Sequence, residues 1–165
     1  MKPARIVPIA ADYIEGFRAA LDSVAREQRY LAMLEAPPID EVTRFVKEGI
    51  ASGTPQMVAI ADEKIVGWCD VWRKPRAALK HSGILGMGVI ESYRGRGIGK
   101  ALMGSALQAA KERGFTRIEL TVRVDNPRAK RLYEQFGFVE EGVCRRHMCI
   151  NGECTDSYLM AVLYG

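Results

Sequence analysis

Glycine and basic residues are concentrated in one short stretch, which comprises Arg94, Gly95, Arg96, Gly97, Ile98, Gly99 and Lys100. An apolar run precedes it and a helical pattern follows it, so it reads as the turn between a strand and a helix. Backbone N–H groups converge in such a turn, and the helix dipole adds positive charge. Anions, phosphates above all, bind there, and glycine lets the backbone approach the ligand closely.

The spacing of this stretch excludes two common phosphate motifs. A nucleoside-triphosphate loop would need a glycine at Arg94 and a hydroxyl at Ala101. The dinucleotide motif would need its third glycine where Lys100 or Leu102 stands. The observed pattern is R-x-x-G-x-G over residues 94–99, and the alternative interpretation of it is a turn without a ligand.

A second motif begins at Asn126. Asn126 and Pro127 are typical of a helix start, and Gly137 of a helix end. Asn126 and Tyr133 are seven residues apart, about two helical turns, so both can lie on one side of this helix. In one interpretation Tyr133 faces the same side as Asn126 and acts there, and in the other it packs in the core as part of an apolar stripe.

These motifs lie within an alternation of strands and helices. Strands are expected at 5–9, 57–61, 65–72, 83–90, 118–124, 138–150 and 153–163. Helices are expected at 12–27, 40–52, 97–113 and 127–136.

Local signals mark several ends of these elements. Asp12 and Asp40 are the predicted N-caps of the first two helices, and Gly114 is the predicted left-handed cap of the third. The apolar face of the second helix is predicted to comprise Val42, Phe45, Val46 and Ile50. Asn151-Gly152 predicts a tight hairpin between the last two strands.

Composition fits one globular domain over residues 1–165. The chain has 165 residues, 48% of them hydrophobic, and 24 Lys plus Arg against 20 Asp plus Glu. The net charge of +4 is too small to favour nucleic acid as a partner. No apolar run approaches the roughly 18 residues of a membrane span, and the basic N-terminus lacks a signal region, so a cytoplasmic protein is expected.

The cysteines and histidines show no metal-binding spacing. Cys144, Cys149 and Cys154 recur every five residues, with Cys69 far away, and none forms a C-x-x-C pair. We expect all four to be reduced and no metal to be bound. The two histidines, His81 and His147, are isolated and are interpreted as structural or solvated.

Residues 89–102 resemble the pyrophosphate-binding motif of the GNAT superfamily of acetyl-CoA-dependent N-acetyltransferases. Residues 126–138 resemble its second signature, an Asn followed by a helix that carries Tyr and ends in Gly-Phe. The order of the two motifs also matches. The resemblance implies an α/β (α+β) fold with a mixed, mostly antiparallel sheet of six to seven strands, splayed in the middle and flanked by about four helices.

The resemblance also implies the roles of the site residues. Acetyl-CoA would lie in the splayed cleft, with backbone groups of Val89, Ile90 and Glu91 on pantetheine and the amides of residues 94–100 on the pyrophosphate. Asn126 would bind the same cosubstrate. A primary amine would attack the thioester directly, and Tyr133 would protonate the leaving thiolate. The family often has a proline in the turn before the glycine motif, whereas Ser92 lies near that place here, which is a minor departure.

Several points stay open at this level. The general base could be Glu27, Glu35, Asp156 or water, and the amine could belong to a small molecule, an amino acid or a protein N-terminus. A non-catalytic acyl-CoA-binding or sensor domain is the alternative function. The terminal hairpin, as an exposed sheet edge, is a candidate surface for a homodimer.

Overall fold

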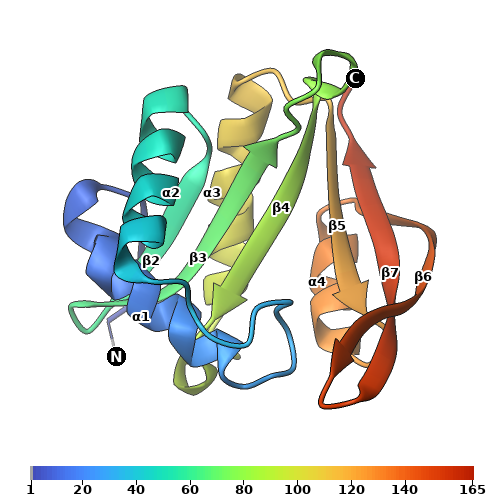
Figure 1. Ribbon diagram of the computed structural model, residues 1–165. Helices are drawn as coiled ribbons and strands as arrows, with labels where there is room; N and C mark the ends of the chain where they lie inside the picture. The colour runs from blue at the N-terminus through green and yellow to red at the C-terminus, as the bar shows by residue number, and fades with distance from the viewer. Residues whose placement is uncertain (1) are drawn as a thin grey trace.

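A computed structural model describes residues 2–165, which form a seven-stranded sheet between two layers of helices (Figure 1). The strand order is β1-β2-β3-β4-β5-β7-β6. The strands are β1 (Arg5–Pro8), β2 (Gln56–Ala61), β3 (Lys64–Arg73), β4 (Ser82–Val89), β5 (Arg117–Arg123), β6 (Val139–Ile150) and β7 (Glu153–Leu163).

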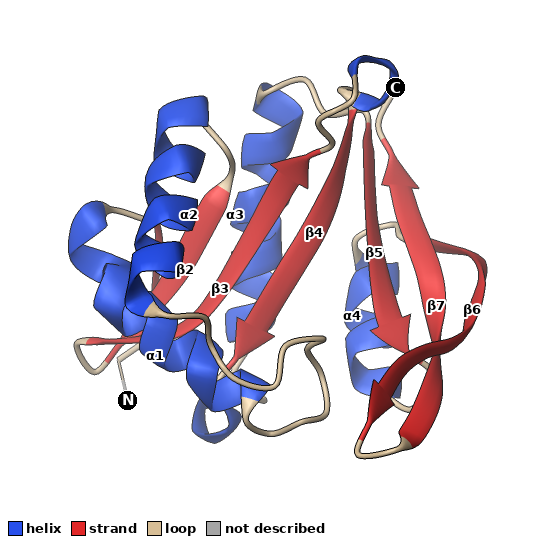
Figure 2. Cartoon of the chain, viewed as in Figure 1, coloured by secondary structure: helices blue, strands red, loops and turns tan. Residues whose placement is uncertain are grey.

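Four α-helices cover the sheet: α1 (Ile14–Ala25), α2 (Ile39–Ser52), α3 (Ile98–Glu112) and α4 (Pro127–Gln135). Figure 2 shows α1 and α2 on one face and α3 and α4 on the other. The buried side chains form one cluster on each face of the sheet. Phe17 of α1, Val46 of α2 and Trp68 of β3 belong to one cluster, and Leu102 of α3 and Ile118 of β5 belong to the other. No helix within residues 2–165 is long and apolar enough to cross a membrane.

The sheet opens between β4 and β5. These two strands are parallel, whereas every other neighbouring pair is antiparallel. Their pairing is confined to Ser82–Ile84 on β4 and Arg117–Glu119 on β5, after which the strands diverge (Figure 1). The predicted fold class is therefore confirmed, including the position of the splay.

The predicted N-caps of the first two helices were wrong. A single 3₁₀ turn, Ala11–Tyr13, places Asp12 before α1, and the cap position is Tyr13 without a side-chain hydrogen bond. Pro38 occupies the cap position of α2, which leaves Asp40 inside the first turn. There the negative charge of Asp40 interacts favourably with the positive end of the helix dipole, but its side chain does not cap an N–H group.

The apolar face of α2 is narrower than predicted. Val42 and Val46 are buried, but Phe45 and Ile50 are 37% and 46% exposed. The face of α2 that packs on the protein follows Val42, Val46 and Gly49, so Phe45 lies at its margin. Its ring instead contacts that of Trp72, with the ring centroids 4.3 Å apart.

The last hairpin is confirmed, but the predicted reduced state of its cysteines was wrong. Asn151 and Gly152 both have positive φ, 51° and 81°, as the tight turn requires. The turn pairs Cys149 directly with Cys154, and a disulfide joins the two. A C-x₄-C spacing centred on Asn-Gly was the sequence signal for this bond, while Cys69 and Cys144 are free thiols.

Candidate active site

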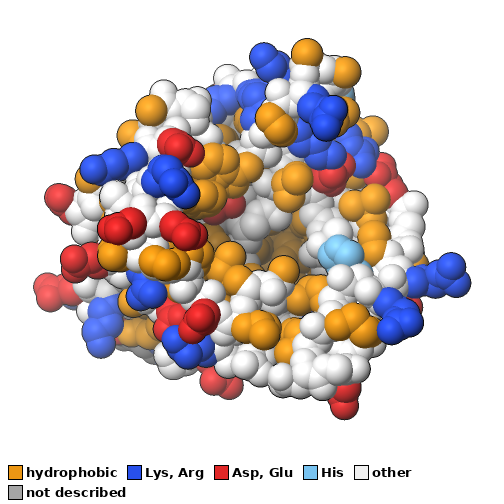
Figure 3. Space-filling view, in the orientation of Figure 1, with side chains coloured by type: hydrophobic (Ala, Val, Ile, Leu, Met, Phe, Trp, Pro, Cys, Tyr) orange, Lys and Arg blue, Asp and Glu red, His pale blue; other side chains and the backbone are white. Residues whose placement is uncertain are grey.

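A cleft of about 480 Å³ lies where β4 and β5 diverge. Its lining comes from the glycine turn, α4, residues 30–32, β6 and β7. Figure 3 shows the molecule hollowed on the face that carries α1 and α2. The two sequence motifs and a part of the chain without any motif therefore meet in one space.

The glycine turn presents backbone to this cleft. Gly97 is the N-cap of α3 with φ 78°, and no side chain caps the helix, so the N–H groups of the first turn have no acceptor within the helix. Residues Gly95, Gly97, Ile98, Gly99 and Lys100 all line the cleft. A Cβ built on Gly97 would meet no atom within 4 Å. Exposed amides and an open surface are the features that a pyrophosphate group needs.

The Arg94 side chain serves the fold of the turn. Its guanidinium donates to both oxygens of Glu27, with Nη1–Oε2 at 2.8 Å, and its Nε donates to the Val89 carbonyl at 2.8 Å. The hydrogen bonds to Glu27 raise the pKa of Arg94 further. Because Glu27 follows α1, this pair connects that helix to the glycine turn. The Glu27 carboxylate also offsets the positive charge that Arg94 was expected to present to a ligand.

Arg96, the other arginine of the turn, lies outside the cleft lining. Its guanidinium donates to the Ser92 carbonyl at 2.8 Å and stacks over the Tyr93 ring, 4.8 Å from the centroid. Lys100 does line the cleft. Of the three predicted cations, Arg94 and Lys100 therefore line the ligand space, and Arg94 is already paired with Glu27.

The structure divides the three residues assigned to pantetheine. Val89 lines the cleft, whereas Ile90 and Glu91 do not. The Ile90 N–H donates to the Val66 carbonyl at 2.9 Å. The Val89 carbonyl is also engaged, since it accepts the hydrogen bond from Arg94.

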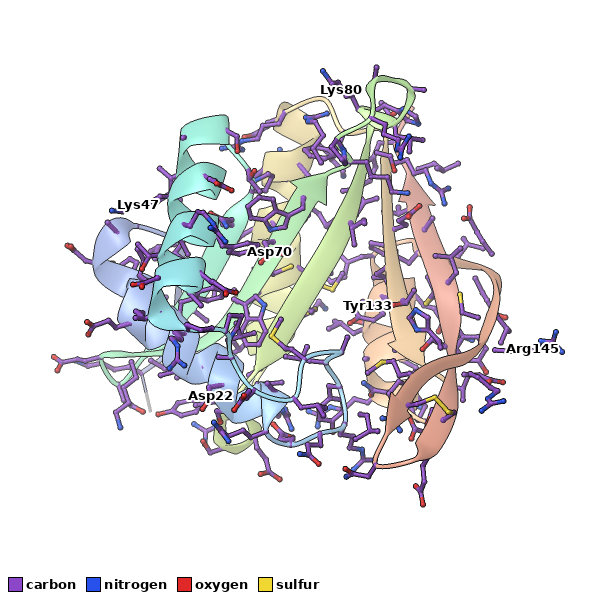
Figure 4. All side chains as sticks on the ribbon, viewed as in Figure 1. Asp22, Lys47, Asp70, Lys80, Tyr133 and Arg145 are labelled. Atoms are coloured by element: carbon purple, nitrogen blue, oxygen red, sulfur yellow. A yellow bond between two sulfur atoms is a disulfide. The ribbon has the colours of Figure 1, made fainter. Side chains whose placement is uncertain are left out.

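The α4 motif folds as predicted. The Asn126 Oδ1 caps the helix by accepting the Ala129 N–H at 3.3 Å, with Pro127 in the first turn. Asn126 and Tyr133 both line the cleft, so they lie on one side of α4. Figure 4 shows Tyr133 at the opening between β4 and β5.

Burial keeps the Tyr133 hydroxyl protonated. Desolvation, with a smaller contribution from the nearby Cys69, raises the pKa of Tyr133 well above its ordinary value. Its ring packs 6.0 Å from that of Phe138, which fixes the side chain. A neutral phenol held in the cleft is able to donate a proton to a developing anion.

None of the three carboxylates considered as a base lines the cleft within residues 2–165. Glu27 pairs with Arg94, and the largely exposed Glu35 pairs with Arg26 at 3.3 Å. The Asp156 Oδ1 accepts the Arg146 N–H at 2.7 Å. Their hydrogen bonds give all three structural roles.

Two polar residues that the sequence did not indicate also line the cleft. His147 of β6 and Ser157 of β7 form a hydrogen bond, with Nδ1 and Oγ 3.0 Å apart. The sequence predicts a structural or solvated role for His147, whereas the structure places it in the cleft lining. No local spacing signals its position, because it depends on how β6 pairs with β7.

The family model of the acetyltransferase (GNAT) family matches residues 20–138, most of the chain. The chain belongs to this family. This acetyltransferase is 37% identical to the L-amino acid N-acetyltransferase AaaT of Escherichia coli K12 over 112 residues, which cover 66% of the chain and 68% of that protein. It is 31% identical to a putative ribosomal protein bS18 alanine N-acetyltransferase of Bacillus subtilis, over 64% of the chain and 66% of the relative.

Solved structures agree with this assignment. A GNAT acetyltransferase from Streptococcus pneumoniae superposes with a TM-score of 0.92 at 26% identity, covering 98% of this chain and 99% of that one. A phosphinothricin acetyltransferase from Sinorhizobium meliloti, solved with acetyl-CoA, shares the fold with a TM-score of 0.92 at 18% identity, over 99% and 90% of the two chains. The acetyltransferase is thus an N-acetyltransferase of the GNAT type, with acetyl-CoA as its cosubstrate.

Proposed function

We propose that this acetyltransferase transfers the acetyl group of acetyl-CoA to a primary α-amine, that of an amino acid or of a protein N-terminus. The observation that carries the proposal is the single cleft in which the open amides of the glycine turn and the neutral phenol of Tyr133 meet. Acetyl-CoA supplies an activated thioester there. The glycine turn holds the pyrophosphate end of acetyl-CoA, and Tyr133 provides a proton for the leaving thiolate.

Each assigned residue has one task in this scheme. The amides of residues 97–100 hold the pyrophosphate and Asn126 lies beside it, while β4 at Val89 aligns the pantetheine arm. Tyr133 donates its proton to the sulfur as the C–S bond breaks. Its pKa, raised by burial, keeps that proton in place until the thiolate forms.

The charges of the cleft favour an amine that also carries a carbonyl or carboxylate. No aspartate or glutamate lines the cleft in the part of the chain that the structure describes. Arg128 lines it, and so does Arg123, whose guanidinium is paired with Asp125 at 2.8 Å. A polyamine would find no counter-charge there, but the polar end of an amino acid or peptide would. Two relatives, an L-amino acid N-acetyltransferase and a putative ribosomal-protein alanine N-acetyltransferase, are named for acceptors of this kind.

A panel of amines tests this function. Release of free thiol from acetyl-CoA is measured with L-amino acids, with short peptides of differing N-terminal residues and with polyamines. The acetylated products are identified by mass spectrometry. We expect turnover with α-amines and little with polyamines. Acetyl-CoA binding without turnover on any amine would support the alternative, a non-catalytic acyl-CoA sensor.

Three broader expectations belong to this proposal. Residues 1–165 act as one N-acetyltransferase domain, and the enzyme works in the cytoplasm. The enzyme forms a homodimer through β6, which is an edge strand with exposed Val139 and Val143. Light scattering that finds a monomer at high concentration would contradict the dimer.

A further inference from the structure

The edge strand β6 contains a bulge beside the cleft. Cys144 pairs with Ser157 and Met148 with Thr155, so residues 145–147 of β6 stand opposite the single residue Asp156 of β7. Arg146 has φ 51°, an uncommon value for a residue with a side chain. The Asp156 carboxylate holds this conformation by accepting the Arg146 N–H. Bulges of this kind change the direction of a side chain and are frequent beside active sites.

The bulge brings His147 to the cleft. Figure 4 shows Arg145, two residues earlier, pointing outward into solvent, whereas His147 lines the cleft with its Nδ1 3.0 Å from the buried Ser157 Oγ. When Nδ1 carries the hydrogen and donates to Ser157, Nε2 has a free lone pair. An imidazole oriented through one nitrogen by a second residue is a common arrangement for a base.

The remaining ionisable groups of the cleft cannot take a proton at neutral pH. Its cations are Arg94, Lys100, Arg123 and Arg128, which have no lone pair to offer while charged. Burial holds the Tyr133 hydroxyl in its protonated form. No carboxylate lines the cleft in residues 2–165. Imidazole alone among these side chains exchanges a proton near neutral pH.

We infer that His147 is the general base that removes a proton from the acceptor amine, with Ser157 and Asp156 as positioning residues. The inference rests on the proposed function. Nε2 takes one proton from the ammonium form of the acceptor and later passes it to solvent. The free amine then forms the C–N bond as the C–S bond breaks, the sulfur takes the Tyr133 proton, and the second proton shed by nitrogen restores Tyr133.

One further acid lies near this space and has to be separated from His147. Asp70 of β3 is buried, and a methyl group added to Gly86, which lines the cleft, would come within 3.2 Å of its Oδ1. Burial raises the pKa of Asp70 to about 7. A pH profile measured on the wild type alone would therefore not distinguish the two groups.

The test compares His147→Asn with His81→Asn and Asp70→Asn, using an α-amine turned over by the wild type. Asn keeps an N–H for Ser157 but cannot act as a base. His81 is an exposed histidine outside the cleft lining and is the matched control. We expect His147→Asn to lower kcat/KM at pH 7 by at least about a hundredfold. Calorimetric binding of acetyl-CoA should change by less than about twofold, since the glycine turn is intact.

The shape of the pH profile decides the role. The ascending limb between about pH 5 and 8 should persist in His81→Asn and Asp70→Asn. In His147→Asn it should be replaced by a continuous rise toward the pKa of the free amine, and added imidazole should restore activity to His147→Ala. Wild-type activity in His147→Asn, or loss of the limb in Asp70→Asn instead, would overturn the inference. Absence of wild-type turnover with every amine would refute the proposed function itself.

Discussion

The cleft has two walls that are built in different ways. The glycine-turn wall consists of backbone N–H groups from consecutive residues, 97–100, and its shape is set by the positive φ of Gly95 and Gly97. The β6–β7 wall consists of side chains, His147 and Ser157, which lie ten residues apart and meet through a bulge. One wall depends on local backbone conformation, and the other on the register between two strands.

This difference decides which changes each wall tolerates. A wall made of backbone groups tolerates many substitutions, provided that no added Cβ obstructs the ligand and that the positive φ angles of the turn are kept. A side-chain wall needs the identity of each residue and every contact that orients it. We therefore expect substitutions in the first wall to change the affinity for acetyl-CoA, and substitutions in the second to change kcat.

The largest effect is expected at Tyr133, which lies beside the glycine-turn wall but acts through its side chain. Tyr133→Phe removes the hydroxyl and keeps the ring that packs near Phe138. General acid catalysis contributes about a hundredfold to ten-thousandfold, so the single-turnover rate should fall by at least roughly two decades. Acetyl-CoA affinity should stay unchanged. A Phe variant that reacts at the wild-type rate would leave Tyr133 with a packing role alone.

Gly97→Val tests the backbone wall directly. Valine at φ 78° is strained by about 1–3 kcal/mol, and its side chain projects where the ligand approaches. Calorimetry should show Kd for acetyl-CoA raised by at least about tenfold. Gly114→Val is the control, since Gly114 has φ 80° and equally open surroundings but does not line the cleft. Equal binding losses in the two variants would attribute the effect to folding.

A pH-dependent effect on stability is expected at Asp70, the buried carboxyl of β3 beside the cleft. The unfolded carboxyl loses its proton near 3.8, whereas the folded one keeps it until about pH 7. The folded state therefore binds the extra proton between these values, and the free energy of unfolding from this group falls as pH rises.

Asp70→Asn should remove this fall, because the amide stays neutral. Relative to the wild type, the variant should gain roughly 2 kcal/mol between pH 5 and pH 7.5, as measured by urea unfolding at each pH. A constant difference between the two proteins across this range would show that Asp70 does not titrate as described.

The smallest effect is expected at Glu27, which supports the glycine-turn wall from α1. Glu27→Gln removes the charge opposite Arg94 but keeps a hydrogen-bond acceptor. Both side chains are about one-fifth exposed, so we expect a loss of about threefold to tenfold in acetyl-CoA affinity. The kcat of Glu27→Gln at saturating acetyl-CoA should equal that of the wild type. A change in kcat without a change in affinity would remove the distinction between the walls.

The two kinds of wall also explain what the sequence could predict. The glycine turn and the Asn126 cap depend on contacts within a few residues, so spacing alone located them. The roles of Arg94 and Glu27 were missed because 67 residues separate the partners. His147 was missed because no local pattern predicts that residues 145–147 bulge against Asp156. The disulfide was predictable, since the hairpin turn fixed the pairing of Cys149 with Cys154.

The divergence of β4 and β5 has a consequence for hydration. Past Ile84 and Glu119 the two strands no longer pair with each other, so backbone polar groups in the middle of a sheet face each other across a space. Such groups cannot stay dry without a large energetic cost. Water must enter the centre of this fold whenever the cleft holds no ligand. Binding there exchanges that water for the polar groups of the ligand, so the displacement of water is a fixed part of the affinity.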